Sequence, residues 1–142
     1  MIFWDSSAII PLCIDEPNTK TVQQILKKDG VMAVWWGSSV ECYSAFSRLR
    51  REGHLKSDAE DRVRHLLAML ADAWIEIEPS NNIKDIAERL LRIYPLHAAD
   101  ALQLASALIW AEQRPKGHQF LCFDAKLSDA AKKEGFVVLP SS

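Results

Sequence analysis

Four acidic residues stand at the ends of apolar segments or near the starts of helical ones: Asp5, Glu41, Asp100 and Asp124. Asp5 and Asp124 directly follow short apolar runs of the kind that form buried strands. Glu41 and Asp100 lie early in stretches with helical periodicity. In an open parallel sheet, strand ends and helix starts meet at one edge, where ligands bind. The sequence therefore predicts that the four carboxylates converge in one pocket.

A cluster of four carboxylates is electrostatically unfavourable on its own. Two unit charges about 4 Å apart repel by about 4 kcal/mol at an effective dielectric constant near 20, so protons or cations must compensate them. Mg²⁺ and Mn²⁺ prefer carboxylate and water oxygens, and substrate phosphate commonly completes the shell around Mg²⁺. One or two such ions can activate water and stabilise the leaving oxygen of a phosphodiester. The pattern thus predicts metal-dependent phosphodiester hydrolysis without a catalytic His or Ser.

Each of these acids also has an ordinary structural interpretation. Asp5 and Asp124 are suited to cap the N-termini of the helices that follow them. Glu41, in the first turn of a helix, interacts favourably with the helix dipole. Asp100 is harder to explain in this way, because it borders a buried helix face, where a charge needs a partner. The coincidence of all four favours a site over four separate helix-start residues.

Length, charge and cysteine content restrict the class of protein. With 142 residues, 49% of them hydrophobic, the chain suits a single domain spanning residues 1–142. Its formal net charge of −2 gives no overall basic signature of a nucleic-acid binder. Three cysteines without CxxC spacing favour reduced thiols in a cytoplasmic protein. No signal peptide or membrane span is expected, because charged and polar residues interrupt the long apolar stretches.

Strand-like and helix-like patterns alternate along the whole chain, which is typical of βαβ units. Strands are expected at residues 1–4, 31–35, 74–77, 119–123 and 136–139. Helices fill the gaps, and a helical hairpin separates the second and third strands. The fold class is therefore α/β, with a central, mostly parallel sheet of about five strands flanked by helices.

Local signals predict where the two helices of this hairpin begin and end. Ser39 is suited to cap the helix that carries Glu41, and Gly53 provides a stop at its C-terminus. The second helix opens with the pattern of a capping box, in which Ser57 and Glu60 satisfy each other's free backbone N–H groups.

Four segments, taken in order, are specific enough to compare with a known family. They are Met1-Ile-Phe-Trp-Asp-Ser-Ser-Ala, Glu41 in its helix, Ala99-Asp100-Ala101-Leu-Gln-Leu-Ala-Ser-Ala, and Leu121-Cys-Phe-Asp124-Ala-Lys-Leu. Together they resemble the PIN-domain ribonucleases and, within them, the VapC toxins of bacterial and archaeal toxin–antitoxin pairs. The resemblance covers essentially the whole chain and implies a three-layer PIN-like fold.

This resemblance implies an activity, a set of site residues and partners. The metal-binding and catalytic acids would be Asp5, Glu41, Asp100 and Asp124, and Ser6 would be a supporting hydroxyl. The activity would be a Mg²⁺- or Mn²⁺-dependent endoribonuclease that hydrolyses RNA and acts as the toxin of a toxin–antitoxin pair. A homodimer and a cognate antitoxin are also implied, and the helical pair between residues 39 and 71 could provide an apolar face for either. The chain departs from the pattern at Cys122, where such proteins often carry Thr or Ser, because a thiol is a poorer hydrogen-bond partner.

Further residues are candidates for substrate contacts. Trp36, five residues before Glu41, could stack on an RNA base, and His97, one turn before Asp100, could touch the substrate. A local structural role is the ordinary alternative for His97. Five arginines in the helical hairpin could contact RNA phosphates, or could simply be solvated: Arg48, Arg50, Arg51, Arg62 and Arg64.

Several alternatives to a toxin remain open from the sequence. Within the same family, they are a housekeeping PIN-type nuclease and a PIN-like binding module that has lost catalysis. A phosphorylation-controlled signalling domain fits poorly, because the third expected strand ends without an aspartate to accept phosphate. A dehalogenase-like phosphatase requires a second aspartate two residues after Asp5, where the chain has Ser7.

Overall fold

The computed structural model describes residues 1–141, and in this range strands and helices alternate as the sequence predicts. The strands are β1 (Ile2–Trp4), β2 (Met32–Trp35), β3 (Ile75–Ile77), β4 (Gln119–Leu121) and β5 (Val137–Leu139). The helices are α1 (Ser6–Cys13), α2 (Thr19–Lys28), α3 (Ser38–Arg51), α4 (Ser57–Ala73), α5 (Asn81–Ile93), α6 (Ala98–Trp110) and α7 (Ala125–Glu134). Each strand lies within a segment expected to be one.

The five strands form one sheet in the order β3-β2-β1-β4-β5, and every pair of neighbours is parallel. The chain builds outward from β1 in one direction and then returns to add β4 on the other side. The strand order therefore reverses between β1 and β4, and ligands bind at such a switch point in open α/β sheets. The predicted α/β fold with a parallel sheet of about five strands is confirmed.

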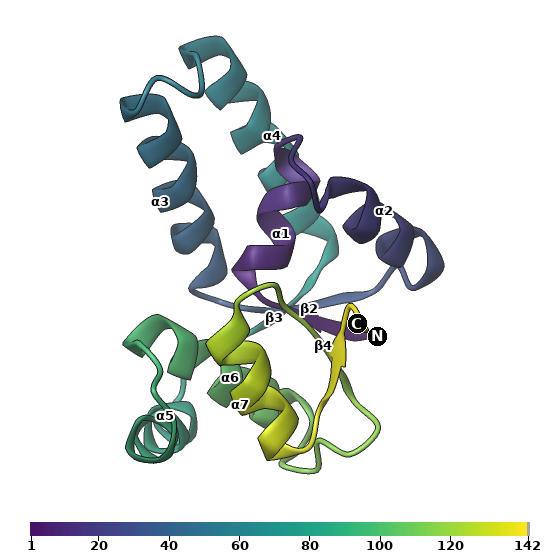
Figure 1. Cartoon of the computed structure of the whole chain (residues 1–142), viewed down its shortest axis with the longest axis vertical. Coiled ribbons are helices and arrows are strands. Elements are labelled where there is room, and N and C mark those ends of the chain that lie inside the picture. The colour runs from purple at the N-terminus through teal and green to yellow at the C-terminus, as the bar shows by residue number, and fades with distance from the viewer. Residues whose placement is uncertain (142) are drawn as a thin grey trace.

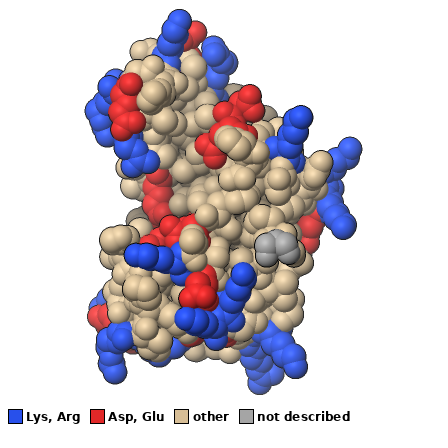
Figure 2. All heavy atoms as spheres, in the orientation of Figure 1, with Lys and Arg blue, Asp and Glu red and all other residues tan. Residues whose placement is uncertain are grey.

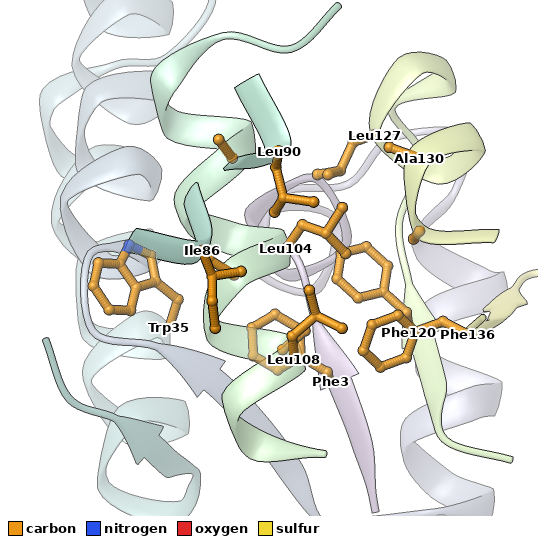
Figure 3. Packing of buried hydrophobic residues seen from close by; sticks show 14 of the residues in the cluster. Phe3, Trp35, Ile86, Leu90, Leu104, Leu108, Phe120, Leu127, Ala130 and Phe136 are labelled. Carbon is orange, nitrogen blue, oxygen red and sulfur yellow. The ribbon is translucent and has the colours of Figure 1, made fainter. Parts of the chain in front are cut away.

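Helices cover both faces of the sheet and make three layers (Figure 1). The first four helices, α1 to α4, pack on one face against a core that includes Trp4 and Leu121. The last three, α5 to α7, pack on the opposite face around Phe3, Leu104 and Phe120, as Figure 3 shows. None of the helices within residues 1–141 has the length and apolar character needed to cross a membrane.

The start of α3 differs from the sequence-based expectation. The helix begins at Ser38, with Gly37 at the N-cap position, so the prediction that Ser39 caps it was wrong. Ser38 is fully buried, and its hydroxyl oxygen accepts a hydrogen bond from Gln103 at 2.8 Å. A side chain at position 37 would collide with the Trp35 indole, because a Cβ there would lie 2.5 Å from Nε1. The end of this helix agrees with the prediction, since Gly53 follows it with a φ of 80°.

The start of α4 also differs, because the predicted capping box between Ser57 and Glu60 does not form. The helix begins at Ser57 itself, and the N-cap residue Lys56 makes no side-chain cap. Glu60 is buried and forms ion pairs with Arg64 on the same helix and with Arg50 on α3. Two charged partners compete better for the carboxylate than a single backbone N–H, so Glu60 joins the two helices instead of capping one.

Candidate active site

The four acids predicted from the sequence line one cavity of about 230 Å³ at the carboxyl edge of the sheet. Asp5 follows β1, Asp124 precedes α7, and Glu41 and Asp100 lie in the first turns of their helices. The acids therefore come from four separate segments that meet beside the β1/β4 switch point. Figure 2 shows acidic side chains gathered at the waist of the molecule, between the hairpin of α3 and α4 and the opposite end formed by α5, α6 and α7.

Asp5 is the most deeply buried of the four, with 4% of its surface exposed. It caps α1, because its Oδ2 atom accepts hydrogen bonds from the Ser7 backbone N–H at 3.1 Å and from the Ser7 hydroxyl at 2.5 Å. The Cys122 thiol lies 3.5 Å from the same oxygen. Asp5 thus both caps a helix and lines the cavity.

Glu41 is held through both of its carboxylate oxygens. The Ser6 hydroxyl donates to Oε1 at 2.8 Å, and the Gln103 side-chain amide donates to Oε2 at 3.1 Å. The same amide nitrogen also donates to Ser38 Oγ. Gln103 has no exposed surface, and its Oε1 atom is a buried acceptor with no hydrogen-bond partner in the described structure. These contacts define the direction in which the carboxylate of Glu41 points.

The other two acids are bound by backbone N–H groups at helix starts. Asp100 Oδ2 accepts from the His97 backbone N–H at 3.3 Å, and Asp124 Oδ1 accepts from the Leu127 backbone N–H at 2.8 Å. In each case a helix N-terminus orients the carboxylate and favours its negative charge. Asp100 is half-buried, whereas Asp124 is exposed at the rim of the cavity.

Burial and mutual repulsion make the ionised forms of Asp5, Glu41 and Asp100 unfavourable. The pKa of Glu41 is raised to about 7, chiefly by burial and in part by the nearby charges of Asp5 and Asp100, against the hydrogen bonds from Ser6 and Gln103 that lower it. Burial also raises the pKa of Asp5, to which Asp100 adds repulsion. For Asp100 itself, burial and then the charge of Asp124 raise the pKa. The cavity is therefore a place where a cation would relieve charge repulsion.

The donor set suits a hard divalent cation, although the side chains are not arranged as a closed cage. Within residues 1–141, no three His, Cys, Asp or Glu side chains stand close enough together to hold one ion as they are placed. Mg²⁺ does not require such a cage, because it usually keeps several waters and takes one or two protein carboxylates plus substrate phosphate. Four carboxylates around one cavity fit this mode of binding.

The other sequence-based candidates differ in their relation to the cavity. Ser6 lines it and contacts Glu41, but Trp36 and His97 are not among its lining residues. Trp36 is 51% exposed and packs edge-on against Trp35, and His97 acts through its backbone at the start of α6. Contact of Trp36 or His97 with a substrate that extends beyond this cavity stays a prediction.

Sequence reasoning did not single out three residues that belong to the site. Ser7 binds Asp5 and also accepts a hydrogen bond from the Phe123 backbone N–H at 3.0 Å. Gln103 positions Glu41, and its place three residues after Asp100 was the available signal, since a buried polar residue on a helix needs a partner. Arg48 was considered only as one of five arginines, yet it alone among them lines the acidic cavity.

Comparisons with known proteins agree with this fold. The chain resembles a solved structure of a toxin–antitoxin complex from Klebsiella pneumoniae, with 16% identity, a TM-score of 0.63, and coverage of 89% of this chain and 88% of the other. It also resembles VapC20 from Mycobacterium tuberculosis, described as a sarcin-ricin loop cleaving toxin, with 18% identity, a TM-score of 0.68, and coverage of 96% of this chain and 97% of the other. A third similar structure is FitAcB from Neisseria gonorrhoeae, with 16% identity, a TM-score of 0.65, and coverage of 97% of this chain and 96% of the other. No curated protein matches the chain by sequence.

The family itself is shown by a sequence model rather than by these distant structural likenesses. The model of the PIN domain matches residues 2–133 and therefore spans nearly the whole chain, including all four acids of the cavity. Its match agrees with the resemblance that the acidic motifs indicate. The chain belongs to the PIN domain family.

Proposed function

We propose that this protein is a metal-dependent endoribonuclease that hydrolyses RNA phosphodiester bonds and serves as the toxin of a toxin–antitoxin pair. The observation that carries the proposal is the meeting of Asp5, Glu41, Asp100 and Asp124 around one cavity of a PIN domain. These residues would bind Mg²⁺ or Mn²⁺, and the same four are the proposed catalytic acids. The similarity to a structure described as a sarcin-ricin loop cleaving toxin supports RNA as the substrate.

The chemistry divides between the bound ion and the side chains. When bound, the ion would supply positive charge for the phosphate and lower the pKa of a water molecule. Asp5 and Glu41 are held in place by Ser7, Ser6 and Gln103, so they need little rearrangement to act as ligands. Hydrolysis adds the water oxygen to phosphorus and breaks one P–O ester bond. The water proton passes to a carboxylate or to solvent, and the departing ribose oxygen takes up a proton to become a hydroxyl.

Cleavage of RNA by the purified protein tests this proposal. We expect cleavage with Mg²⁺ or Mn²⁺, none with EDTA, and none by an Asp100→Asn variant purified in the same way. This variant keeps an acceptor for the His97 N–H but removes the charge. An exposed aspartate outside the cavity, changed as Asp72→Asn, provides the matched control and should cleave like the wild type. Equal cleavage by the Asp100 variant would assign the activity to a contaminant or to another site.

A partner protein is part of the same proposal. The similarity to a toxin–antitoxin complex supports a cognate antitoxin, which would dock near the acidic cavity. An apolar groove of about 320 Å³ between α3 and α4, with Val40 70% exposed beside it, offers a protein partner surface to bury. We also propose a homodimer. Light scattering of the protein alone and with the product of a neighbouring gene tests both partners, and a lone monomer that binds no such product would point to a housekeeping nuclease.

The third candidate, a PIN-like binding module without catalysis, has one observation in its favour. Cys122 stands 3.3 Å from the Asp124 backbone N–H and 3.5 Å from Asp5, where a hydroxyl would make stronger hydrogen bonds. Metal binding without cleavage of any RNA in a broad panel would support this module over the nuclease.

A further inference from the structure

The acidic cavity continues into a second cavity of about 420 Å³. The two share five lining residues, which are Ser7, Ile10, Ala45, Arg48 and Asp124. They therefore form one trough, with Asp5, Glu41 and Asp100 at one end, the second cavity at the other, and Asp124 where the two meet. A substrate bound at the acids has a path along α3 into this neighbouring space.

Arg48 lies at the junction of the two cavities. It occupies the same face of α3 as Glu41, seven residues later, which corresponds to about 10 Å along the helix axis. Among the residues that line either cavity, it is the one with a positive charge. Within residues 1–141 it forms none of the salt bridges found in the structure, whereas Arg50 and Arg64 are paired with Glu60 and Arg62 with Asp58. Its guanidinium is therefore available to a ligand.

The far end of the second cavity has a different character. Phe123 and Leu49 supply apolar surface, and Glu16 and Asn18 supply polar groups. A phosphate at this end would be repelled by Glu16, whereas a nucleobase has both an apolar face and polar edges that these residues can meet. The charges would therefore orient a nucleotide in the trough, with its phosphate at Arg48 and its base toward Phe123.

We propose that this second cavity is a subsite for the nucleotide next to the cleaved bond, in which Arg48 binds the adjoining phosphate and Phe123 contacts the base. The inference rests on the proposed function, because it takes a single-stranded RNA as the ligand that crosses the acidic cavity. Arg48 acts by binding and positioning the strand, since the bond that breaks lies at the acids. In this arrangement, the charge of Arg48 would allow an overall acidic protein to bind a polyanion beside four carboxylates.

Binding is measured separately from cleavage to test this subsite. The probe is a fluorescein-labelled, random-sequence single-stranded RNA, and its anisotropy is followed in EDTA, where the proposed nuclease cannot cut. We expect Arg48→Ala to weaken binding about tenfold, as for loss of one charge-assisted hydrogen bond, and to reduce the slope of log affinity against log salt by about 0.7. Arg51→Ala is the matched control, because Arg51 lies on the same helix but outside both cavities.

Two further variants examine the base end of the trough. Phe123→Leu keeps apolar volume but removes the aromatic face, so we expect weaker binding with an unchanged salt slope. Arg48→Lys keeps the charge without the planar fork, and we expect it to restore the salt slope but only part of the affinity. In cleavage assays with metal, Arg48→Ala should raise KM more than it lowers kcat.

The outcomes separate the subsite from the proposed function. RNA binding that depends on Arg48, in a protein that cleaves no RNA, would retain the subsite and reject the nuclease. Cleavage by the wild type with equal binding and equal salt slopes for Arg48→Ala and Arg51→Ala would retain the nuclease and overturn the subsite. A wild type that binds no RNA in the anisotropy assay would also overturn the subsite.

Discussion

Ser6 donates a hydrogen bond of 2.8 Å to Glu41 and so connects the first residue of α1 to the first turn of α3. Gln103, on the opposite side of the sheet, binds the other oxygen of the same carboxylate. Glu41 is thus the point where the helices of the two faces meet at the carboxyl edge. Its orientation depends on three helices at once, which makes it sensitive to changes at residues that never touch a substrate.

Removing the Gln103 amide should therefore impair the site without unfolding the protein. We expect Gln103→Leu, which has a similar shape, to lower cleavage and metal affinity about 10- to 100-fold, as is typical when a partner that orients a ligand is lost. Metal titrations of the cleavage rate, together with thermal melting, measure both effects. Gln24→Leu on the exposed face of α2 is the matched control. Unchanged metal affinity in Gln103→Leu would show that Ser6 alone orients Glu41.

The raised pKa of Glu41 predicts a pH-dependent stability of the metal-free protein. A folded-state pKa of about 7 against an ordinary value of 4.5 means that folding favours the protonated carboxyl. This stabilisation is present below pH 4.5 and is lost as the pH rises to about 7. We expect a loss on the order of 1–2 kcal/mol, reduced from the full shift because the group is partly exposed. Urea unfolding in EDTA across this pH range measures it.

The same experiment has an internal control. Glu41→Gln cannot ionise, so its stability should fall less steeply between pH 4.5 and 7 than that of the wild type. Some slope should remain, because the pKa values of Asp5 and Asp100 are also raised. Identical slopes in Glu41→Gln and the wild type would mean that Glu41 ionises normally in the folded protein.

Metal binding should reverse this electrostatic cost. At neutral pH, we expect Mg²⁺ or Mn²⁺ at about 100 times its dissociation constant to stabilise the fold by about 2.7 kcal/mol. Asp100→Asn should have opposite effects in the two conditions: a higher melting temperature in EDTA, because a repelling charge is gone, and a smaller gain on adding metal. Differential scanning fluorimetry with and without EDTA compares them. A variant that gains as much from metal as the wild type would exclude Asp100 as a ligand.

The contacts of the Cys122 thiol predict how the cleavage rates of variants at this position are ordered. Its sulfur accepts from the Asp124 backbone N–H at 3.3 Å and lies against Asp5, so it supports two of the acids. Cys122→Ser places a stronger hydrogen-bonding group there, and we expect cleavage equal to or above that of the wild type. Cys122→Ala removes the support, and we expect a loss of up to about tenfold. Initial cleavage rates at saturating metal measure this order. A higher rate for Cys122→Ala than for Cys122→Ser would show that the side chain at this position only fills space.

The elements of this fold were predictable from the sequence because their signals are local. Most strands are short apolar runs between helical stretches, and all five lie within two residues of the expected bounds. The four acids were predictable because strand ends and helix starts of a parallel sheet share one edge. Their position in one cavity agrees with that prediction, whereas their roles as ligands and catalysts remain predictions.

What the sequence did not predict depends on contacts between distant segments. Ser38 is buried against Gln103, 65 residues later, and no local pattern indicates that pairing. The serine that binds Asp5 could not be told from its neighbour, because Ser6 and Ser7 differ only in the direction their helix gives them. Local rules failed where a tertiary partner was stronger, as at Glu60.

The ion pairs of Glu60 predict a large loss of stability on truncation. Its carboxylate is buried and pairs with Arg64, at 2.6 Å, and with Arg50. It therefore connects the C-terminal end of α3 to α4. We expect Glu60→Ala to lower the free energy of unfolding by about 2–4 kcal/mol, because two arginines lose their partner and a buried group leaves a gap. Asp58→Ala, which removes the exposed pair with Arg62, should cost less than about 1 kcal/mol. Urea unfolding compares the two, and equal losses would mean that Glu60 acts as an ordinary surface charge.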